Sequence, residues 1–217
     1  MTKFAYILPF LALACLTGPV QAATIPNPLH DAPLATDTDQ TLVLAGGCFW
    51  GIEAVFEHVK GVKNAVSGYA GGSAESARYD MVSSAKTGHA EAVQVTYDPA
   101  VITPGQLMKV FFAVAHNPTE LNRQGPDYGP QYRSAVFYTT PEQQDIANDY
   151  IKQLDATKTF SDKIVTKVSA LETFYPAEDY HQGYAERNPA QPYIVMHDLP
   201  KLMALKKKFP ELYVSGK

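Results

Sequence analysis

The stretch from residue 41 to residue 61 constrains the fold of this chain more than any other. Thr41–Ala45 is a short apolar run of the kind that forms a buried strand, and Gly46-Gly47 ends it. After the glycines, apolar residues recur at helical spacing until Gly61, at Phe49, Ile52, Val55, Phe56 and Val59. The sequence therefore predicts a strand, a tight glycine turn and a helix that starts at Cys48.

The rest of the chain continues this alternation of strands and helices. Thr103-Pro104 predicts a helix start, because a capping hydroxyl is followed by a first-turn proline. The order predicts an α+β fold, a ferredoxin-like βαββαβ sandwich in one domain over residues 41–217, with C-terminal helical additions. The remaining core strands are expected at Val62–Tyr69, Ala90–Tyr97 and Ser134–Tyr138, and the additions at Thr140–Leu154 (helix), Ile164–Leu171 (strand) and Leu199–Leu212 (helix).

Composition limits the partners that the chain can have. The 217 residues are 46% hydrophobic and 18% charged, which is the composition of one ordinary soluble domain. The net charge of -4 argues against a phosphate-reading surface, so nucleic acid is excluded as the main partner. The Lys206-Lys207-Lys208 run is interpreted as a solvated helix face, and no stable membrane partner is expected.

Residues 1–22 have the features of a secretory signal peptide. Lys3 is their only charge, Phe4–Leu16 is a largely apolar run, and Val20-Gln21-Ala22 resembles a small-residue cleavage site. The run is shorter than the about 20 apolar residues that span a bilayer. We therefore expect an exported protein, located in the periplasm.

Signal cleavage decides how the two cysteines are interpreted. Cleavage after Ala22 leaves a flexible arm over residues 23–40 and Cys48 as the single thiol, so no internal disulfide can form. Exported domains that use cysteines structurally carry even numbers of them, and a solitary thiol is therefore a candidate reactive group. A lipoprotein signal, with lipidation at Cys15, is the second interpretation. It ranks second because Ala12 stands at the position where such signals resemble one another in carrying leucine.

Cys48 has the expected surroundings of a nucleophile. A thiolate is favoured at a helix N-terminus, which lowers the thiol pKa from about 8.5. The preceding glycines leave room for a substrate, and Phe49 and Trp50 place aromatic rings beside the sulfur. Such a pocket suits an apolar methyl group or thioether better than a charged ligand. The alternative is an inert cysteine that packs as a small hydrophobic residue.

Five segments of the chain resemble one known family. Gly47-Cys48-Phe49-Trp50-Gly51 resembles the active-site motif of the methionine sulfoxide reductase A family, and four further segments follow in that family's order. Together the five are far more specific than any single motif, and the resemblance runs from Leu42 to Pro189. The four segments are Gly68-Tyr69-Ala70-Gly71-Gly72, Gly88-His89-Ala90-Glu91-Ala92-Val93, Arg123-Gln124-Gly125 with Asp127, and Gln131-Tyr132-Arg133-Ser134.

The resemblance implies a reaction and a role for each matching residue. Cys48 would attack the sulfur of a methionine sulfoxide, keep its oxygen as a sulfenic acid and release methionine, with Glu91 as the acid. A carboxyl held in an apolar pocket has a raised pKa and can stay protonated near neutrality. The implied substrate is the S epimer, free or in proteins under repair. Its binding residues would be Phe49, Trp50, Tyr79, Asp127 and Tyr132.

The chain departs from the family's pattern near its C-terminus. Many relatives resolve the sulfenic acid with a second cysteine just past an Asn-Pro pair, which here is Asn188-Pro189 followed by Gln191-Pro192-Tyr193-Ile194. We therefore expect an external thiol reductant, either a thioredoxin-like protein or glutathione. A monomer with no bound cofactor is also expected. Tyr193 can replace a family tyrosine near the substrate, although the local spacing is shifted.

Two other functions compete with the reductase. Ferredoxin-like domains with a cysteine after the first strand include metal carriers, but those usually use two thiols. A peroxidase or a cysteine hydrolase is the other alternative; a hydrolase base could come from His58, His89, His116 or His181, yet none sits in a hydrolase signature. No Cys/His spacing resembles a zinc site, so no metal is expected, and His89 and His181 are interpreted as hydrogen-bonding scaffold.

Overall fold

The computed structural model describes residues 25–36 and 38–215, so the predicted signal peptide lies outside the described residues. The core follows the predicted order, with β1 (Gln40–Ala45), α1 (Phe49–Glu57), β2 (Val62–Ala70), β3 (Ala90–Tyr97), α3 (Pro104–Val110) and β6 (Ala135–Tyr138). The other elements are η1 (Ala74–Ser76), α2 (Tyr79–Val82), η2 (Phe111–Ala115), β4 (Arg123–Gln124), β5 (Asp127–Tyr128), η3 (Pro130–Tyr132), α4 (Pro141–Ala156), β7 (Lys167–Ala170), β8 (Phe174–Pro176), η4 (Asp179–His181), α5 (Tyr184–Arg187), η5 (Ile194–Asp198) and α6 (Leu199–Lys208).

A six-stranded sheet carries the core, in the order β7-β6-β1-β3-β2-β8. Its four inner strands, β6-β1-β3-β2, are each antiparallel to their neighbours. This is the ferredoxin-like arrangement, because each crossover helix connects two parallel strands with a third strand between them. The predicted fold class is confirmed. Beyond the core, β7 joins β6 in parallel and β8 joins β2 antiparallel, so later segments extend both edges.

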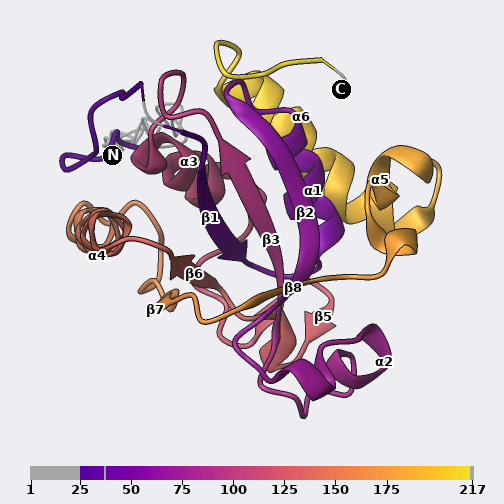
Figure 1. The fold of residues 1–217 in the computed structure, drawn as a ribbon. Helices are drawn as coiled ribbons and strands as arrows, with labels where there is room; N and C mark the ends of the chain where they lie inside the picture. The colour runs from indigo at the N-terminus through magenta and orange to yellow at the C-terminus, as the bar shows by residue number, and fades with distance from the viewer. Residues whose placement is uncertain (1–24, 37, 216–217) are drawn as a thin grey trace, which may run out of the picture.

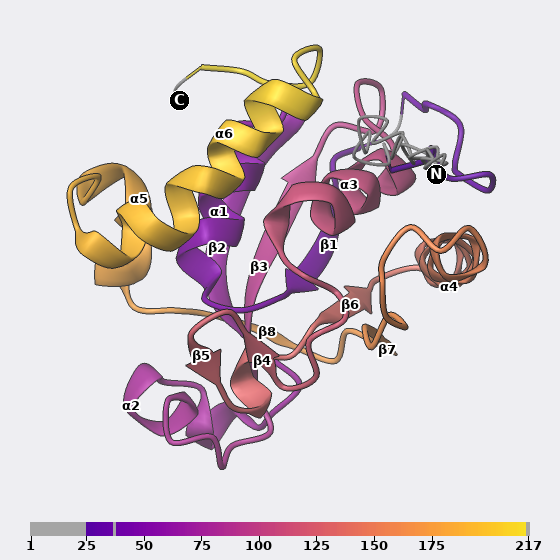
Figure 2. The same ribbon diagram turned by 180° about the vertical axis from the view of Figure 1, so that it is seen from behind.

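The helices cover one face of the sheet. Figure 2 shows α1, α3 and α6 in front of the strands, and Figure 1 looks onto the opposite face. α1 packs between the sheet and α6, which explains why nearly all its residues are buried. The main core therefore joins strand residues such as Leu44 and Val93 to helix residues such as Ile52 and Phe56.

The turn between β1 and α1 depends on two glycines. Gly47 has a φ of +100°, which side chains rarely allow, and a Cβ there would stand 2.5 Å from the Gln124 side chain. A Cβ on Gly46 would stand 2.7 Å from the His116 ring. The chain can therefore turn sharply and place Cys48 at the N-cap of α1, one residue before the helix begins.

Some boundaries outside the core differ from the prediction. α6 ends at Lys208 and not at Leu212, because Phe209 precedes Pro210 and has left the helical conformation (φ -134°, ψ 58°). β7 covers only Lys167–Ala170, since the Ile164 N–H is bonded to the Asp155 carboxylate and not to a strand. The sequence also did not predict the short elements α2, β4, β5, β8 and α5.

The described residues of the predicted arm contact the helices. The Asp31 carboxylate accepts hydrogen bonds from the Thr103 hydroxyl and from the Gly105 N–H at the start of α3. The Tyr150 hydroxyl on α4 donates to the Pro26 carbonyl at 2.7 Å. Thus Asp31 supplements the capping box that Thr103 forms with Gln106. No helix in the described stretches is long and apolar enough to cross a bilayer.

Candidate active site

A single cavity brings the predicted site residues together. It has a volume of about 190 Å³, and all seven side chains predicted for catalysis or substrate binding line it, together with Tyr193. We call it the aromatic cavity; its lining residues are Cys48, Phe49, Trp50, Tyr79, Glu91, Asp127, Tyr132 and Tyr193. A larger cavity, of about 510 Å³, contains Arg133 and Lys167 and none of these residues.

Glu91 lies on β3 and is held beneath the start of α1. Its side chain is 1% exposed, and one carboxyl oxygen accepts a hydrogen bond from the Phe49 N–H at 3.2 Å. Burial raises the pKa of Glu91 to about 8, against the lowering effect of that hydrogen bond and with a small addition from Asp127. The carboxyl is therefore mainly protonated at neutral pH, as the sequence predicts for a proton donor.

The protonation of Cys48 differs from the prediction. The residue is only 8% exposed, and burial raises the pKa of its thiol well above the usual value. Glu91 and Asp198 raise it further, while the Trp50 N–H and Lys201 act in the opposite direction. The prediction that the helix start lowers this pKa is wrong, because desolvation of the buried sulfur outweighs the effect of the N–H groups.

Three tyrosine hydroxyls belong to the aromatic cavity. Tyr79 begins α2, where its N–H donates to a Glu178 carboxyl oxygen at 2.9 Å, and Tyr132 ends η3. Tyr193 donates its hydroxyl to Asp127. Burial raises the pKa of all three phenols, so each keeps its proton and can act as a neutral donor. The shifted spacing around Tyr193 thus does not keep it out of the cavity.

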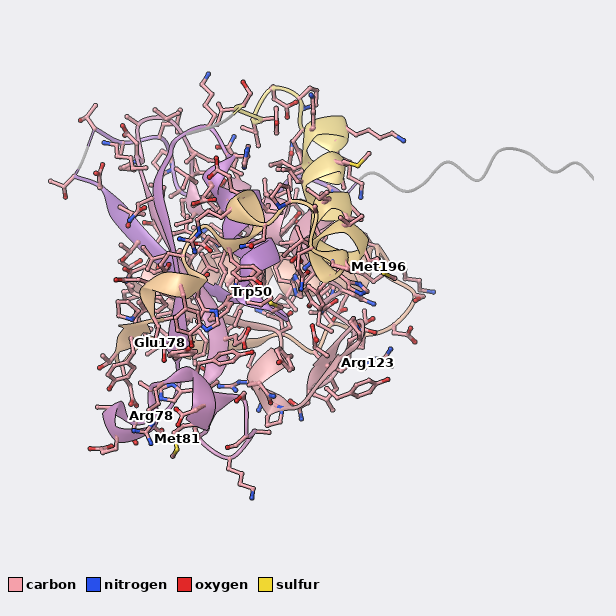
Figure 3. All side chains as sticks on the ribbon, turned by 90° about the vertical axis from the view of Figure 1, so that its right-hand side faces the viewer. Trp50, Arg78, Met81, Arg123, Glu178 and Met196 are labelled. Carbon is pink, nitrogen blue, oxygen red and sulfur yellow. The ribbon has the colours of Figure 1, made fainter. Side chains whose placement is uncertain are left out.

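Aromatic contacts fix the Trp50 ring at the wall of the cavity. Trp50 stacks on Tyr184 with ring centroids 3.9 Å apart, and its indole N–H donates to His181 at 3.2 Å. His181 also lies against the Phe49 ring, at 4.9 Å between centroids. In Figure 3, Trp50 lies between Glu178 on one side and Met196 on the other. The prediction that His181 serves as hydrogen-bonding scaffold agrees with these contacts.

Glu178 is a site residue that the sequence did not reveal. Its carboxylate accepts from the Tyr69 hydroxyl at 2.8 Å and from the Tyr79 N–H, and so ties β2 to α2. His89, in contrast, was predicted as scaffold, and its ring nitrogen lies 2.9 Å from the Ser73 carbonyl oxygen. Within the described residues, no group of three or more His, Cys, Asp or Glu side chains could hold a metal ion.

The fold and the site together define a class of enzyme. A ferredoxin-like core presents one thiol, one protonated carboxyl and several phenol donors to a cavity walled by aromatic rings. Such a cavity excludes charged substrates and offers proton donors to a neutral one. This is a cysteine-dependent oxidoreductase that acts on a small neutral group.

Comparison with known proteins identifies the family. The family model described as peptide methionine sulfoxide reductase matches residues 40–213. The peptide methionine sulfoxide reductase MsrA 2 of Mesorhizobium japonicum is 54% identical over 82% of this chain and 92% of its own length. The peptide methionine sulfoxide reductase MsrA 2 of Synechocystis sp. is 50% identical over 86% of this chain and 89% of its own length. The chain belongs to the peptide methionine sulfoxide reductase family.

Solved structures agree with this assignment. The reduced form of Mxr1 from Saccharomyces cerevisiae superimposes with a TM-score of 0.65 at 34% identity, covering 70% of this chain and 87% of that one. Methionine sulfoxide reductase A of Corynebacterium diphtheriae superimposes with a TM-score of 0.60 at 34% identity, covering 79% of this chain and 86% of that one. The protein is therefore a thiol-dependent reductase of methionine sulfoxide that repairs oxidised proteins, with an external thiol as reductant and no bound cofactor.

Proposed function

We propose that Cys48 is the nucleophile and Glu91 the proton donor of this reductase. The observation that carries the proposal is their shared cavity, in which the Glu91 carboxyl is bonded to the N–H of the residue after Cys48. Cys48 attacks the sulfoxide sulfur, and Glu91 gives its proton to the sulfoxide oxygen. The oxygen then moves with its proton to the Cys48 sulfur, as the sulfur–oxygen bond of the substrate and the new sulfur–sulfur bond break. Methionine leaves, and the thiol proton passes to Glu91. Cys48 is left as a sulfenic acid.

The substrate is held by groups that carry no charge. Tyr79 and Tyr132 donate their hydroxyls to the sulfoxide oxygen, where negative charge develops during the attack. Phe49 and Trp50 enclose the S-methyl group, which a polarizable thioether contact favours. Asp127 orients the site through its hydrogen bond from Tyr193. This fixed placement of oxygen and methyl selects one sulfoxide hand, the S epimer, in free methionine or in proteins.

The sulfenic acid is reduced by two equivalents of external thiol. The first thiolate forms a disulfide with Cys48 and releases the oxygen as water, and the second regenerates the Cys48 thiol. Cys48 is the one free cysteine among the described residues, and Gln191-Pro192-Tyr193-Ile194 stands where many relatives carry a resolving cysteine. The reductant is either a thioredoxin-like protein or glutathione.

The location and assembly of the protein are also proposed from its sequence. Residues 1–22 direct export to the periplasm, and cleavage after Ala22 leaves a catalytic domain over residues 41–217 behind a short arm. The mature protein is a monomer without a stable membrane partner. A lipid anchor at Cys15 is the competing arrangement, and mass spectrometry of the exported chain distinguishes a free N-terminus at Ala23 from a lipidated Cys15.

A single-turnover experiment tests the assignment of Cys48. The protein is mixed with each epimer of N-acetylmethionine sulfoxide without reductant, and the N-acetylmethionine formed is counted. We expect one equivalent from the S epimer with wild-type protein and none with Cys48→Ser. In the uncleaved chain, Cys15→Ser removes the other thiol and should still give one equivalent. Methionine formation by Cys48→Ser in the presence of dithiothreitol would contradict the assignment.

A further inference from the structure

The position of the Trp50 ring depends on residues that do not themselves line the aromatic cavity. Trp50 is half-buried and lines that cavity, whereas His181 and Tyr184 contact its ring and do not. Trp50 is also the only tryptophan of the sequence, so tryptophan fluorescence reports on this ring alone. A half-buried indole can change its rotamer within nanoseconds unless neighbouring groups prevent it. The room beside the Cys48 sulfur therefore depends on what holds this ring.

Tyr184 supports one face of the indole. The centroids of the Tyr184 and Trp50 rings are 3.9 Å apart and the rings are only 12° from parallel, so they are stacked in direct contact. The indole N–H donates to Nδ1 of His181 at 3.2 Å, and the Tyr193 ring lies nearly perpendicular to the indole at 6.1 Å between centroids. The stack opposes tilting of the indole, and the hydrogen bond opposes its rotation in its own plane.

The segment that carries Tyr184 is tied to the same helix as Trp50. Glu53 lies about one turn after Trp50 on α1 and is 2% exposed, and one of its carboxyl oxygens accepts the Gly183 N–H at 3.1 Å. The Gln182 side chain is hydrogen-bonded to the backbone of β2. Figures 1 and 2 show α5, which begins at Tyr184, beside α1. These hydrogen bonds fix Tyr184 relative to α1 independently of the ring stack.

A fixed indole limits the alkyl group that the cavity accepts on the substrate sulfur. In the proposed function, Phe49 and Trp50 enclose the S-methyl group, within a cavity of about 190 Å³. A larger alkyl group would have to displace one of these rings, and a pocket with rigid walls resists such overpacking. One additional methylene in an apolar pocket changes kcat/KM by about 10- to 200-fold. If the indole could swing aside, an ethyl group would fit and most of this difference would disappear.

We propose that Tyr184 is a positioning residue of the reductase, which holds the Trp50 ring in place and so restricts the cavity to an S-methyl group. This role rests on the proposed function, in which Trp50 encloses that methyl group. Tyr184 does not touch the substrate; it acts through the indole, while His181 fixes the second direction of the ring. Sulfoxides with a larger S-alkyl group are disfavoured by size alone, because the chemistry at their sulfur is the same.

Two substrates that differ by one methylene measure this restriction. The S epimers of N-acetylmethionine sulfoxide and N-acetylethionine sulfoxide are compared by kcat/KM, with dithiothreitol as reductant. We expect the wild-type protein to prefer the methyl compound by about tenfold or more. In Tyr184→Leu, which removes the stacked ring, the preference should fall to within about threefold, because the indole can move away from an ethyl group. A general loss of folded protein would lower both values equally and leave their ratio unchanged.

Two control variants and a spectroscopic measurement assign the effect to the stack. Tyr184→Phe keeps the stacking ring and should keep the wild-type preference. Tyr213→Leu should also keep it, since it removes another half-buried tyrosine, stacked on His58 at the opposite end of α1 from Trp50. Time-resolved fluorescence anisotropy follows the Trp50 ring directly. Tyr184→Leu should add a nanosecond decay that the wild type and both controls lack.

The outcomes separate this inference from the function it rests on. If the wild type does not reduce the methyl sulfoxide, the proposed function itself is rejected. If Trp50→Leu keeps the wild-type preference, Trp50 does not enclose the S-alkyl group, and the role of Tyr184 is rejected with it. When Trp50→Leu does lose the preference, a full preference or an unchanged anisotropy decay in Tyr184→Leu would overturn the positioning role. Equal kcat/KM for the two sulfoxides in the wild type, or loss of the preference in either control, would do the same.

Discussion

At the scale of single residues, burial makes two side chains of the site, Glu91 and Cys48, harder to deprotonate than they would be in water. Burial raises the pKa of Glu91 to about 8 and that of Cys48 well above its usual value. Both groups are thus mainly neutral at pH 7, and the cavity can admit an uncharged sulfoxide without an unpaired charge beside it. The proton that the substrate oxygen needs is already present on Glu91.

This pair predicts how the first half-reaction depends on pH. The rate of methionine release should fall above pH 8, because the Glu91 carboxyl loses the proton that it donates. In Glu91→Gln the rate should be lower by about 100-fold or more, and it should lack the fall above pH 8. Single-turnover rates between pH 6 and 9.5 measure both profiles. A wild-type rate that keeps rising through pH 9.5 would exclude Glu91 as the donor.

Residues near one another in sequence were easier to predict than residues that meet only in the fold. All seven predicted site residues line the aromatic cavity; six stand in the five family segments, and Tyr79 was assigned because it matches a family tyrosine. Glu178 and Lys201 were missed, since neither stands in one of the five family segments and each meets the site only through tertiary contacts. The pKa of Cys48 was predicted in the wrong direction because burial cannot be read from a local motif.

At the scale of elements, periodicity decided what could be predicted. β3 matched its predicted bounds, and α1 and β2 differed by no more than two residues at an end, because each contributes several apolar residues to the core. α2 and β8 have four and three residues, too few for a periodic pattern. Tertiary contacts define them instead, and the Glu178 carboxylate, just after β8, is one that fixes the start of α2.

The link between β8 and α2 can be tested through Glu178. Glu178→Ala removes the acceptor for the Tyr79 N–H and the Tyr69 hydroxyl, so Tyr79 should be poorly placed and kcat/KM should fall about tenfold. Tyr79→Phe removes the hydroxyl itself. If Glu178 acts through Tyr79, the double variant should be little worse than Tyr79→Phe alone. If the losses in kcat/KM of the two single variants multiply in the double variant, the positioning role is contradicted. Glu178→Gln should recover most of the activity, because its amide oxygen still accepts a hydrogen bond.

At the scale of the whole molecule, the buried acid opposes stability. The pKa of Glu91 rises from 4.5 in a solvated chain to about 8 in the folded protein. Between these values the folded state binds a proton that the unfolded state has lost, so the free energy of unfolding falls as the pH rises. Below pH 4.5 Glu91 is protonated in both states, and the free energy of unfolding is not reduced. Above about pH 8 the reduction is complete. Glu53, whose pKa burial raises to about 7, acts in the same direction.

Removing this acid should therefore make the protein more stable while it becomes less active. Between pH 6 and 8.5, the free energy of unfolding of the wild type should fall by about 2–3 kcal/mol more than that of Glu91→Gln, measured by urea denaturation. The glutamine keeps an oxygen to accept the Phe49 N–H, so packing is preserved. Comparing the two proteins cancels Glu53 and also His116, whose pKa burial lowers to about 3. Parallel curves would mean that Glu91 is ionised in the folded protein, and it could then not supply the proton.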